Sequence, residues 1–167
     1  MEIPTELGKL MGIGWRHTAL TPIEVRSRAL PFTSRPQDLE GVTTPHDDAF
    51  VIRATIANYD VARIFVDTGS SVNVLYKDAF DRMQIDQEEL QPMATSLFRF
   101  SGHEVQPLGQ IQLPLSLGEE PLWRTHKHPL HNGGRSVRLQ CHLGRPALSS
   151  FGAVVSTFHQ KLKFPDL

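Results

Sequence analysis

The segment Asp67-Thr68-Gly69 holds the residues of this chain that are best suited to chemistry. An apolar run, Ile64-Phe65-Val66, leads into it, Gly69 lets backbone amides approach the carboxylate, and Thr68 adds a hydroxyl. Two such turns facing one another would bring two carboxylates within hydrogen-bond distance. Like charges that close cannot both ionise, so the pair shares one proton and titrates as a unit. The motif therefore predicts hydrolysis, in which one acid activates a water and the other polarises the scissile carbonyl.

The chain contains a single motif of this kind. A site with two carboxylates then requires a second chain, related to the first by a two-fold axis. The alternative is that Asp67 only initiates a turn before residues 72–83. The apolar runs on both sides of the motif favour the catalytic interpretation.

The elements that must position this motif are short strands. Residues 50–57 alternate apolar and polar side chains, residues 58–60 have turn chemistry, and 61–66 form a second apolar run. Apolar residues at helical spacing predict a short helix within 75–83, and 97–117 reads as a hairpin with glycines around its tip. Two more strands are expected within 153–164. We expect residues 1–36 to be a linker or disordered tail and 37–167 to be one domain, mainly β, a small closed barrel with one or two short helices.

Composition supports this fold class and bears on the cellular compartment. Twelve prolines and twelve glycines argue against a helical bundle. The single cysteine, Cys141, excludes an internal disulfide framework and suits a reducing compartment. The N-terminus is acidic, and no apolar run is long enough for a signal core or a membrane span. We expect a cytoplasmic or nuclear protein that is not secreted and does not bind membranes.

Several stretches, together well over half of the chain, carry a specific resemblance. They include Ile64-Phe65-Val66-Asp67-Thr68-Gly69-Ser70-Ser71, Phe100-Ser101-Gly102-His103-Glu104-Val105-Gln106-Pro107-Leu108-Gly109 and Leu143-Gly144-Arg145-Pro146. Residues 38–122 and 143–165 closely resemble the protease region of gypsy-class long-terminal-repeat retrotransposon polyproteins, of the kind abundant in plant genomes.

The resemblance implies a retropepsin-like (acid protease) fold, a homodimer without cofactor or metal, and cleavage of the element's own polyprotein. It assigns Asp67 as the catalytic residue and Thr68 and Gly69 as its supporting turn. It also implies a substrate-binding flap that includes Phe100, Ser101, Gly102 and His103. The apolar-apolar-Gly motif that braces the catalytic loop maps to His142-Leu143-Gly144, so Leu143 and Gly144 are the expected structural brace.

The resemblance stops between Trp123 and His142 and then resumes without a change of length. The family has an apolar strand here, whereas this chain has four histidines, and from Pro121 to Pro165 it has seven basic residues and no acid. We interpret residues 123–142 as the product of two compensating frameshifts and expect a solvated irregular loop. The expected loop, and His142 in an aliphatic position, argue against a fully stable fold.

The window 123–142 also permits two sharper interpretations, neither of which the sequence favours. A metal cluster of His126, His128, His131, Cys141 and His142 does not match the spacing of common zinc sites. Binding of nucleic acid through Arg124, Lys127, Arg135 and Arg138 lacks interleaved aromatic residues. The leading function is therefore an aspartic endopeptidase, active or degenerate. The alternatives are a catalytically dead retropepsin-like module that dimerises or binds partners, and an unstable relic with no role.

Overall fold

The computed structural model describes residues 23–26, 33–93, 97–98, 104–118, 123–134, 136 and 138–165. The strands are β1 (Ile23–Arg26), β2 (Val51–Ile56), β3 (Tyr59–Val66), β4 (Val74–Tyr76), β5 (Leu97–Phe98), β6 (Glu104–Val105), β7 (Gln110–Leu117), β8 (Arg124–Gly133), β9 (Cys141–Leu143), β10 (Val154–Ser156) and β11 (Lys161–Pro165). The helices are α2 (Lys77–Arg82) and α3 (Arg145–Phe151), with short 3-10 turns η1 (Pro36–Leu39) and η2 (Gln87–Glu89).

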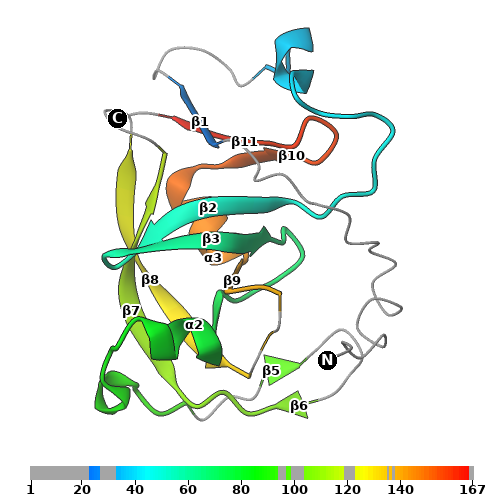
Figure 1. Cartoon of the computed structure of the whole chain (residues 1–167). Coiled ribbons are helices and arrows are strands. Elements are labelled where there is room, and N and C mark those ends of the chain that lie inside the picture. The colour runs from blue at the N-terminus through cyan, green and yellow to red at the C-terminus, as the bar shows by residue number, and fades with distance from the viewer. Residues whose placement is uncertain are drawn as a thin grey trace.

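Six of these strands close into a barrel in the order β2-β3-β9-β4-β8-β7 (Figure 1). β2 and β3 form the expected hairpin, joined at residues 57–58 and paired from Val51↔Phe65 to Ile56↔Tyr59. The helix expected within 75–83 is α2, and α3 follows β9 directly. The prediction of a mainly β domain with a small closed barrel and short helices is confirmed.

β9 occupies the position in the barrel that matters most for the Asp67 motif. It runs parallel to β3, with Val66 opposite Leu143, and antiparallel to β4, with Val74 opposite His142. β3 precedes Asp67 and β4 follows it, and both pair with β9, which lies about seventy residues further along the chain. The Asp67 loop is therefore tied at both of its ends to the same strand.

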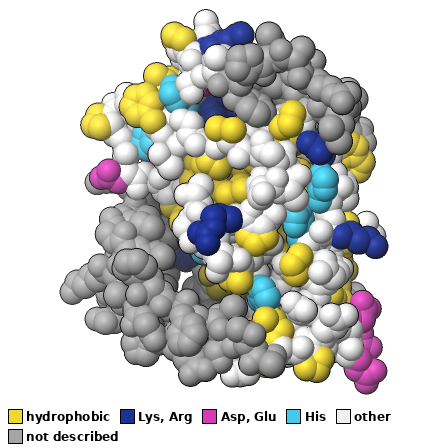
Figure 2. All heavy atoms as spheres, turned by 180° about the vertical axis from the view of Figure 1, so that it is seen from behind, with side chains coloured by type: hydrophobic (Ala, Val, Ile, Leu, Met, Phe, Trp, Pro, Cys, Tyr) yellow, Lys and Arg dark blue, Asp and Glu magenta, His cyan; other side chains and the backbone are white. Residues whose placement is uncertain are grey.

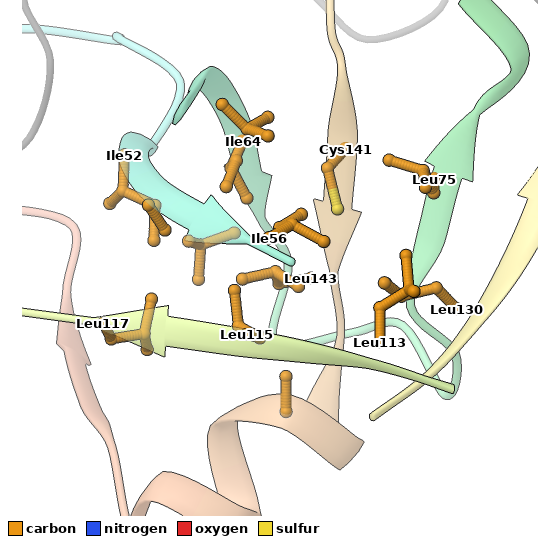
Figure 3. Packing of buried hydrophobic residues seen from close by; sticks show 14 of the residues in the cluster. Ile52, Ile56, Ile64, Leu75, Leu113, Leu115, Leu117, Leu130, Cys141 and Leu143 are labelled. Atoms are coloured by element: carbon orange, nitrogen blue, oxygen red, sulfur yellow. The ribbon is translucent and has the colours of Figure 1, made fainter. Parts of the chain in front are cut away.

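The barrel is filled by aliphatic side chains from all of its strands (Figure 3). Ile52, Ile56 and Ile64 of the first hairpin are fully buried, as are Leu115 of β7 and Leu130 of β8. Cys141 and Leu143 point from β9 into the same cluster. Burial of each such side chain stabilises the fold by about 1.5–3 kcal/mol, so this core is the main force that holds the site elements together.

The prediction of an irregular loop within residues 123–142 is wrong for its first half. β8 is a ten-residue strand that pairs with β7 without interruption from Leu117↔Arg124 to Gln110↔His131. Burial alternates along its first seven residues, with Thr125 and Lys127 exposed and His128 buried, whereas the last four residues of the strand are all buried. The backbone of β7 offers a complete ladder of hydrogen-bonding groups, and pairing with it determines the strand even though the side chains are polar.

A second, three-stranded sheet lies along one side of the barrel, in the order β1-β11-β10 (Figure 1). β1 pairs in parallel with β11, although residues 23–26 fall within the stretch 1–36 expected to be a linker or tail. Asp38 and Lys163 form a buried ion pair that ties η1 to β11. The division into a tail and a domain at residue 36 stays a prediction.

The hairpin expected at 97–117 is shorter than predicted. β5 pairs with β6, while β7 belongs to the barrel. The four residues expected at the flap tip, Phe100 to His103, lie outside the described residues. The part of the chain that the structure describes contains no helix long and apolar enough to cross a membrane. On the face seen in Figure 2, Lys and Arg side chains are scattered among apolar and histidine side chains rather than gathered in one patch.

Candidate active site

Asp67 lies immediately after the end of β3, at the point where the chain leaves the barrel. Its backbone N–H donates to the carbonyl oxygen of Leu143 at 2.9 Å, which continues the β3–β9 ladder by one further hydrogen bond. Its side chain is 34% exposed. The carboxylate is thus held at the end of a strand and is still accessible from outside the chain.

The loop after Asp67 is closed by short-range hydrogen bonds. The Gly69 N–H donates to Asp67 Oδ1 at 2.8 Å, and the Ser70 N–H donates to the Asp67 carbonyl oxygen at 3.3 Å. The Ser70 hydroxyl in turn donates to the Val72 carbonyl oxygen at 3.0 Å. An ionised carboxylate that accepts a backbone N–H is held in orientation by a charge-assisted hydrogen bond. Gly69 therefore binds Oδ1 of the Asp67 carboxylate and does not bind Oδ2.

Gly144 allows the brace strand to approach this loop closely. A β carbon at this position would lie 2.3 Å from the Val72 carbonyl oxygen and 2.7 Å from that of Ser70. Both are backbone atoms, which cannot move without opening the loop. Leu143 accepts the Asp67 N–H, and Gly144 makes room for the loop. The assignment of these two residues as the structural brace stays a prediction.

Asn73 connects three parts of the site from a buried position. It is 1% exposed; its Oδ1 accepts the Gly144 N–H at 3.0 Å, and its Nδ2 donates to the Pro129 carbonyl oxygen at 3.3 Å. The Asn73 carbonyl oxygen also accepts the His131 N–H at 2.9 Å. One side chain therefore joins the brace to β8 and satisfies two backbone groups that would otherwise be buried without partners.

Arg145 is a site residue that sequence reasoning did not single out. Its Nη1 donates to the carbonyl oxygens of Gly69 at 2.6 Å and of Thr68 at 3.4 Å, and its N–H donates to the Ser70 carbonyl oxygen at 2.9 Å. The guanidinium thus clamps the loop from the start of α3. The only signal in the sequence is its place directly after the Leu143-Gly144 pair, and the spacing does not show where its side chain reaches.

His142 is the second residue that the fold brings to Asp67. Its Nε2 lies 3.2 Å from Asp67 Oδ2, and its side chain is 17% exposed. Its ring meets that of Phe65 edge-on, with centroids 5.3 Å apart. Nε2 has no hydrogen-bond partner among the described residues, so the ring is close to the Asp67 carboxylate without being bonded to it. Burial lowers the pKa of His142 below 6.5, and the nearby Asp67 carboxylate partly offsets that shift.

The predicted catalytic residues differ in how they are placed. The carboxylate of Asp67 is held as described above, whereas Thr68 and Gly69 are exposed and face away from the barrel core. The residues expected in the flap, Phe100, Ser101, Gly102 and His103, lie outside the described residues, so their relation to Asp67 stays a prediction.

The other histidines within residues 123–142 and Cys141 contact neighbouring side chains or the core rather than Asp67. His128 lies 2.9 Å from the Ser150 hydroxyl, and His131 Nδ1 lies 2.8 Å from the sulfur of Met93. Burial lowers the pKa values of both rings and, together with Arg124, that of His126. Burial raises the pKa of the Cys141 thiol to about 12. Among the described residues, no three His, Cys, Asp or Glu side chains converge as metal ligands would.

Comparison with known proteins bears on the fold. No protein-family model matches this chain, and no curated protein matches it in sequence. The structure is similar to the retroviral protease-like domain of Ddi1 from Leishmania major, with a TM-score of 0.54, 15% identity, and coverage of 75% of this chain and 95% of that one.

Two further solved structures have TM-scores of 0.49. They are the EIAV protease in complex with an inhibitor (19% identity, 69% of this chain and 99% of that one) and a retropepsin-like aspartic protease from Rickettsia conorii (21% identity, 67% and 80%). The closed barrel and the likeness to the Leishmania domain show that this chain has the fold of retropepsin-like aspartic protease domains.

Proposed function

We propose that this chain is an aspartic endopeptidase domain that works as a homodimer and hydrolyses peptide bonds with a water activated between two Asp67 carboxylates. One observation carries the proposal: Asp67 stands at a strand end, oriented by the Gly69 N–H and partly exposed, in a loop that Gly144, Asn73 and Arg145 hold rigid. Two carboxylates can share a proton only if each chain holds its own carboxylate in a fixed orientation and leaves it accessible to the other chain.

A two-fold axis through the Asp67 loops would complete the site. Thr68 and Gly69, the loop residues next to the carboxylate, are exposed in the single chain and are free to meet the same residues of a second copy. A self-complementary patch of this kind is what a two-fold interface uses. In the dimer, one carboxylate takes a proton from the water while the other, protonated, donates a hydrogen bond to the scissile carbonyl.

The resemblance of the sequence to gypsy-class retrotransposon proteases of plant type supports a narrower proposal. The chain would descend from such an element and cleave its polyprotein in the cytoplasm or nucleus. Cleavage of a peptide that spans a junction of such a polyprotein, at bonds that flank the protease segment, would support this origin. Cleavage of unrelated peptides alone would speak against it.

A second candidate function is a catalytically dead module that keeps the fold and dimerises or binds partners. The contact between His142 and Asp67 favours it, because a protonated imidazole against the carboxylate would compete with a second carboxylate for the same oxygen. The two candidates agree on the dimer and differ only in whether peptide bonds are cleaved.

The experiment that tests the leading proposal compares Asp67→Asn with a matched control. Asp60→Asn makes the same change on the strand that leads to Asp67, at an exposed residue whose ion pair with Arg53 is on the surface and contributes little. Pepstatin-sensitive cleavage should be present in the wild type and in Asp60→Asn and absent in Asp67→Asn. Sedimentation should show a dimer for all three. A folded dimer without cleavage selects the non-catalytic module, and a monomer that still cleaves contradicts the two-carboxylate mechanism.

A further inference from the structure

His142 faces the Asp67 side of β9. Cys141 and Leu143, its neighbours on the strand, both point into the barrel core (Figure 3), and side chains alternate along a strand. The ring of His142 therefore points out of the core, where it lies against Phe65 and 3.2 Å from Asp67 Oδ2. Gly69 holds the other oxygen, Oδ1. The two oxygens of the carboxylate thus have different neighbours, a backbone amide and an imidazole.

Among the residues that the structure describes, His142 has one ionic partner. Asp67, after β3, is the charged group that acts on the ring, and β4 places the apolar Val74 opposite His142. Arg145, at the start of α3, directs its guanidinium to the carbonyl oxygens of Gly69 and Thr68. Burial lowers the pKa of His142 and so favours the neutral ring at neutral pH. Protonation at lower pH would create an imidazolium with Asp67 as its close counterion.

We propose that His142 is a positioning residue that acts through Asp67 and makes the activity of the site fall in acid. This inference rests on the proposed two-carboxylate function. A neutral His142 leaves Oδ2 available to share a proton with Asp67 of a second copy. A protonated His142 forms an ion pair with that oxygen and favours two ionised carboxylates, so the pair loses the proton that polarises the scissile carbonyl. In the dimer both His142 rings then carry a proton on Nε2: one ring takes the proton that the carboxylate pair gives up, and the other takes one proton from solvent.

The first experiment tests the coupling without any need for cleavage. The ring protons of His142 are followed by NMR as a function of pH in the wild type and in Asp67→Asn, and the His142 signal is assigned by its absence in His142→Gln. Removal of the carboxylate should lower the pKa of His142, because Asp67 is what offsets the effect of burial. His126 provides the control, since it contacts Arg124, His128 and Phe151 rather than Asp67 and its titration should not change. An unchanged titration of His142 in Asp67→Asn would overturn the inference.

The second experiment measures cleavage against pH in three proteins. Below the pKa of His142, the wild-type rate should fall by about tenfold per pH unit for each imidazole that must lose its proton. His142→Gln keeps a polar side chain that does not titrate, and His142→Leu restores an aliphatic residue, so both should lose this acid limb. His126→Gln should retain it. Far-UV circular dichroism at each pH separates the effect on rate from unfolding.

The two proposals fail in distinguishable ways. Absence of cleavage in every protein at every pH contradicts the endopeptidase, and the NMR titration alone then decides whether His142 and Asp67 are coupled. Cleavage with the same acid limb in the wild type and in His142→Gln contradicts the role of His142 and leaves the endopeptidase intact.

Discussion

Two buried asparagines in the barrel wall should respond in opposite directions to the same substitution. Asn73 and Asn132 are each 1% exposed. Asn73 has both ends of its amide hydrogen-bonded, to the Gly144 N–H and the Pro129 carbonyl oxygen. The side-chain oxygen and nitrogen of Asn132 have no hydrogen-bond partner in the described structure. Leucine has the same branching as asparagine and no polar atoms, so Asn→Leu at each site isolates the effect of the amide.

The expected magnitudes follow from the groups left without partners. Asn73→Leu strands a buried N–H and a buried C=O, each at a cost of about 1–3 kcal/mol, so the free energy of unfolding should fall by at least about 2 kcal/mol. Asn132→Leu removes two polar atoms that already lack partners and adds apolar surface to the core. Even after some cost for tighter packing, it should raise the free energy of unfolding by about 1–3 kcal/mol.

Urea unfolding followed by fluorescence and by circular dichroism measures both variants on one scale. Coincident transitions with unchanged m-values are needed before the midpoints are compared. The reasoning is refuted if Asn132→Leu is destabilised as much as Asn73→Leu, because hydrogen-bond satisfaction would then not decide the sign at these positions.

Three further predictions concern packing, pH and reactivity. Gly144→Ala should lower the free energy of unfolding, measured in urea, by about 1–3 kcal/mol or more, because the added β carbon meets backbone oxygens. Gly134→Ala is the control: no atom lies within 4 Å of its added β carbon, so the change should be less than about 0.5 kcal/mol. The four histidines with lowered pKa values bind protons more readily in the unfolded chain than in the folded one. The free energy of unfolding should therefore be highest above about pH 6.5 and should decrease as the pH falls below that value. Urea midpoints that do not change between pH 7.5 and 5.5 would contradict this prediction. Cys141, fully buried with its pKa raised to about 12, should react with a thiol reagent only after urea unfolds the protein, and rapid labelling of the native protein would show that β9 opens.

The frameshift interpretation of residues 123–142 is tested by the coding DNA. A shifted reading frame over these codons should encode an apolar peptide that resembles the family. The formation of β8 does not decide the question, because a strand of either composition can pair with β7. The unpartnered amide of Asn132 and the contact of His142 with Asp67 are the features that a restored apolar peptide would remove.

The sequence by itself determined the motif and the strands next to it. Asp67, its glycine turn, the β2–β3 hairpin and helix α2 depend on patterns within about twenty residues, where alternation and turn chemistry act directly on the backbone. Leu143 and Gly144 were assigned as the brace through a resemblance, and the structure shows why a glycine is needed: two carbonyl oxygens occupy the space of a side chain.

Only the tertiary structure decided what surrounds Asp67. The reach of Arg145 to the loop carbonyls and the contact of His142 with the carboxylate join residues far apart in the chain. The pairing of β8 with β7 joins consecutive strands, but the polar composition of β8 hid it. Composition argued against a strand at 124–133, yet the ladder of hydrogen bonds on β7 outweighs the poor apolar content of the partner strand. Whether a histidine lies in solvent or against the Asp67 carboxylate depends on which strands are neighbours, and that depends on the closed barrel as a whole.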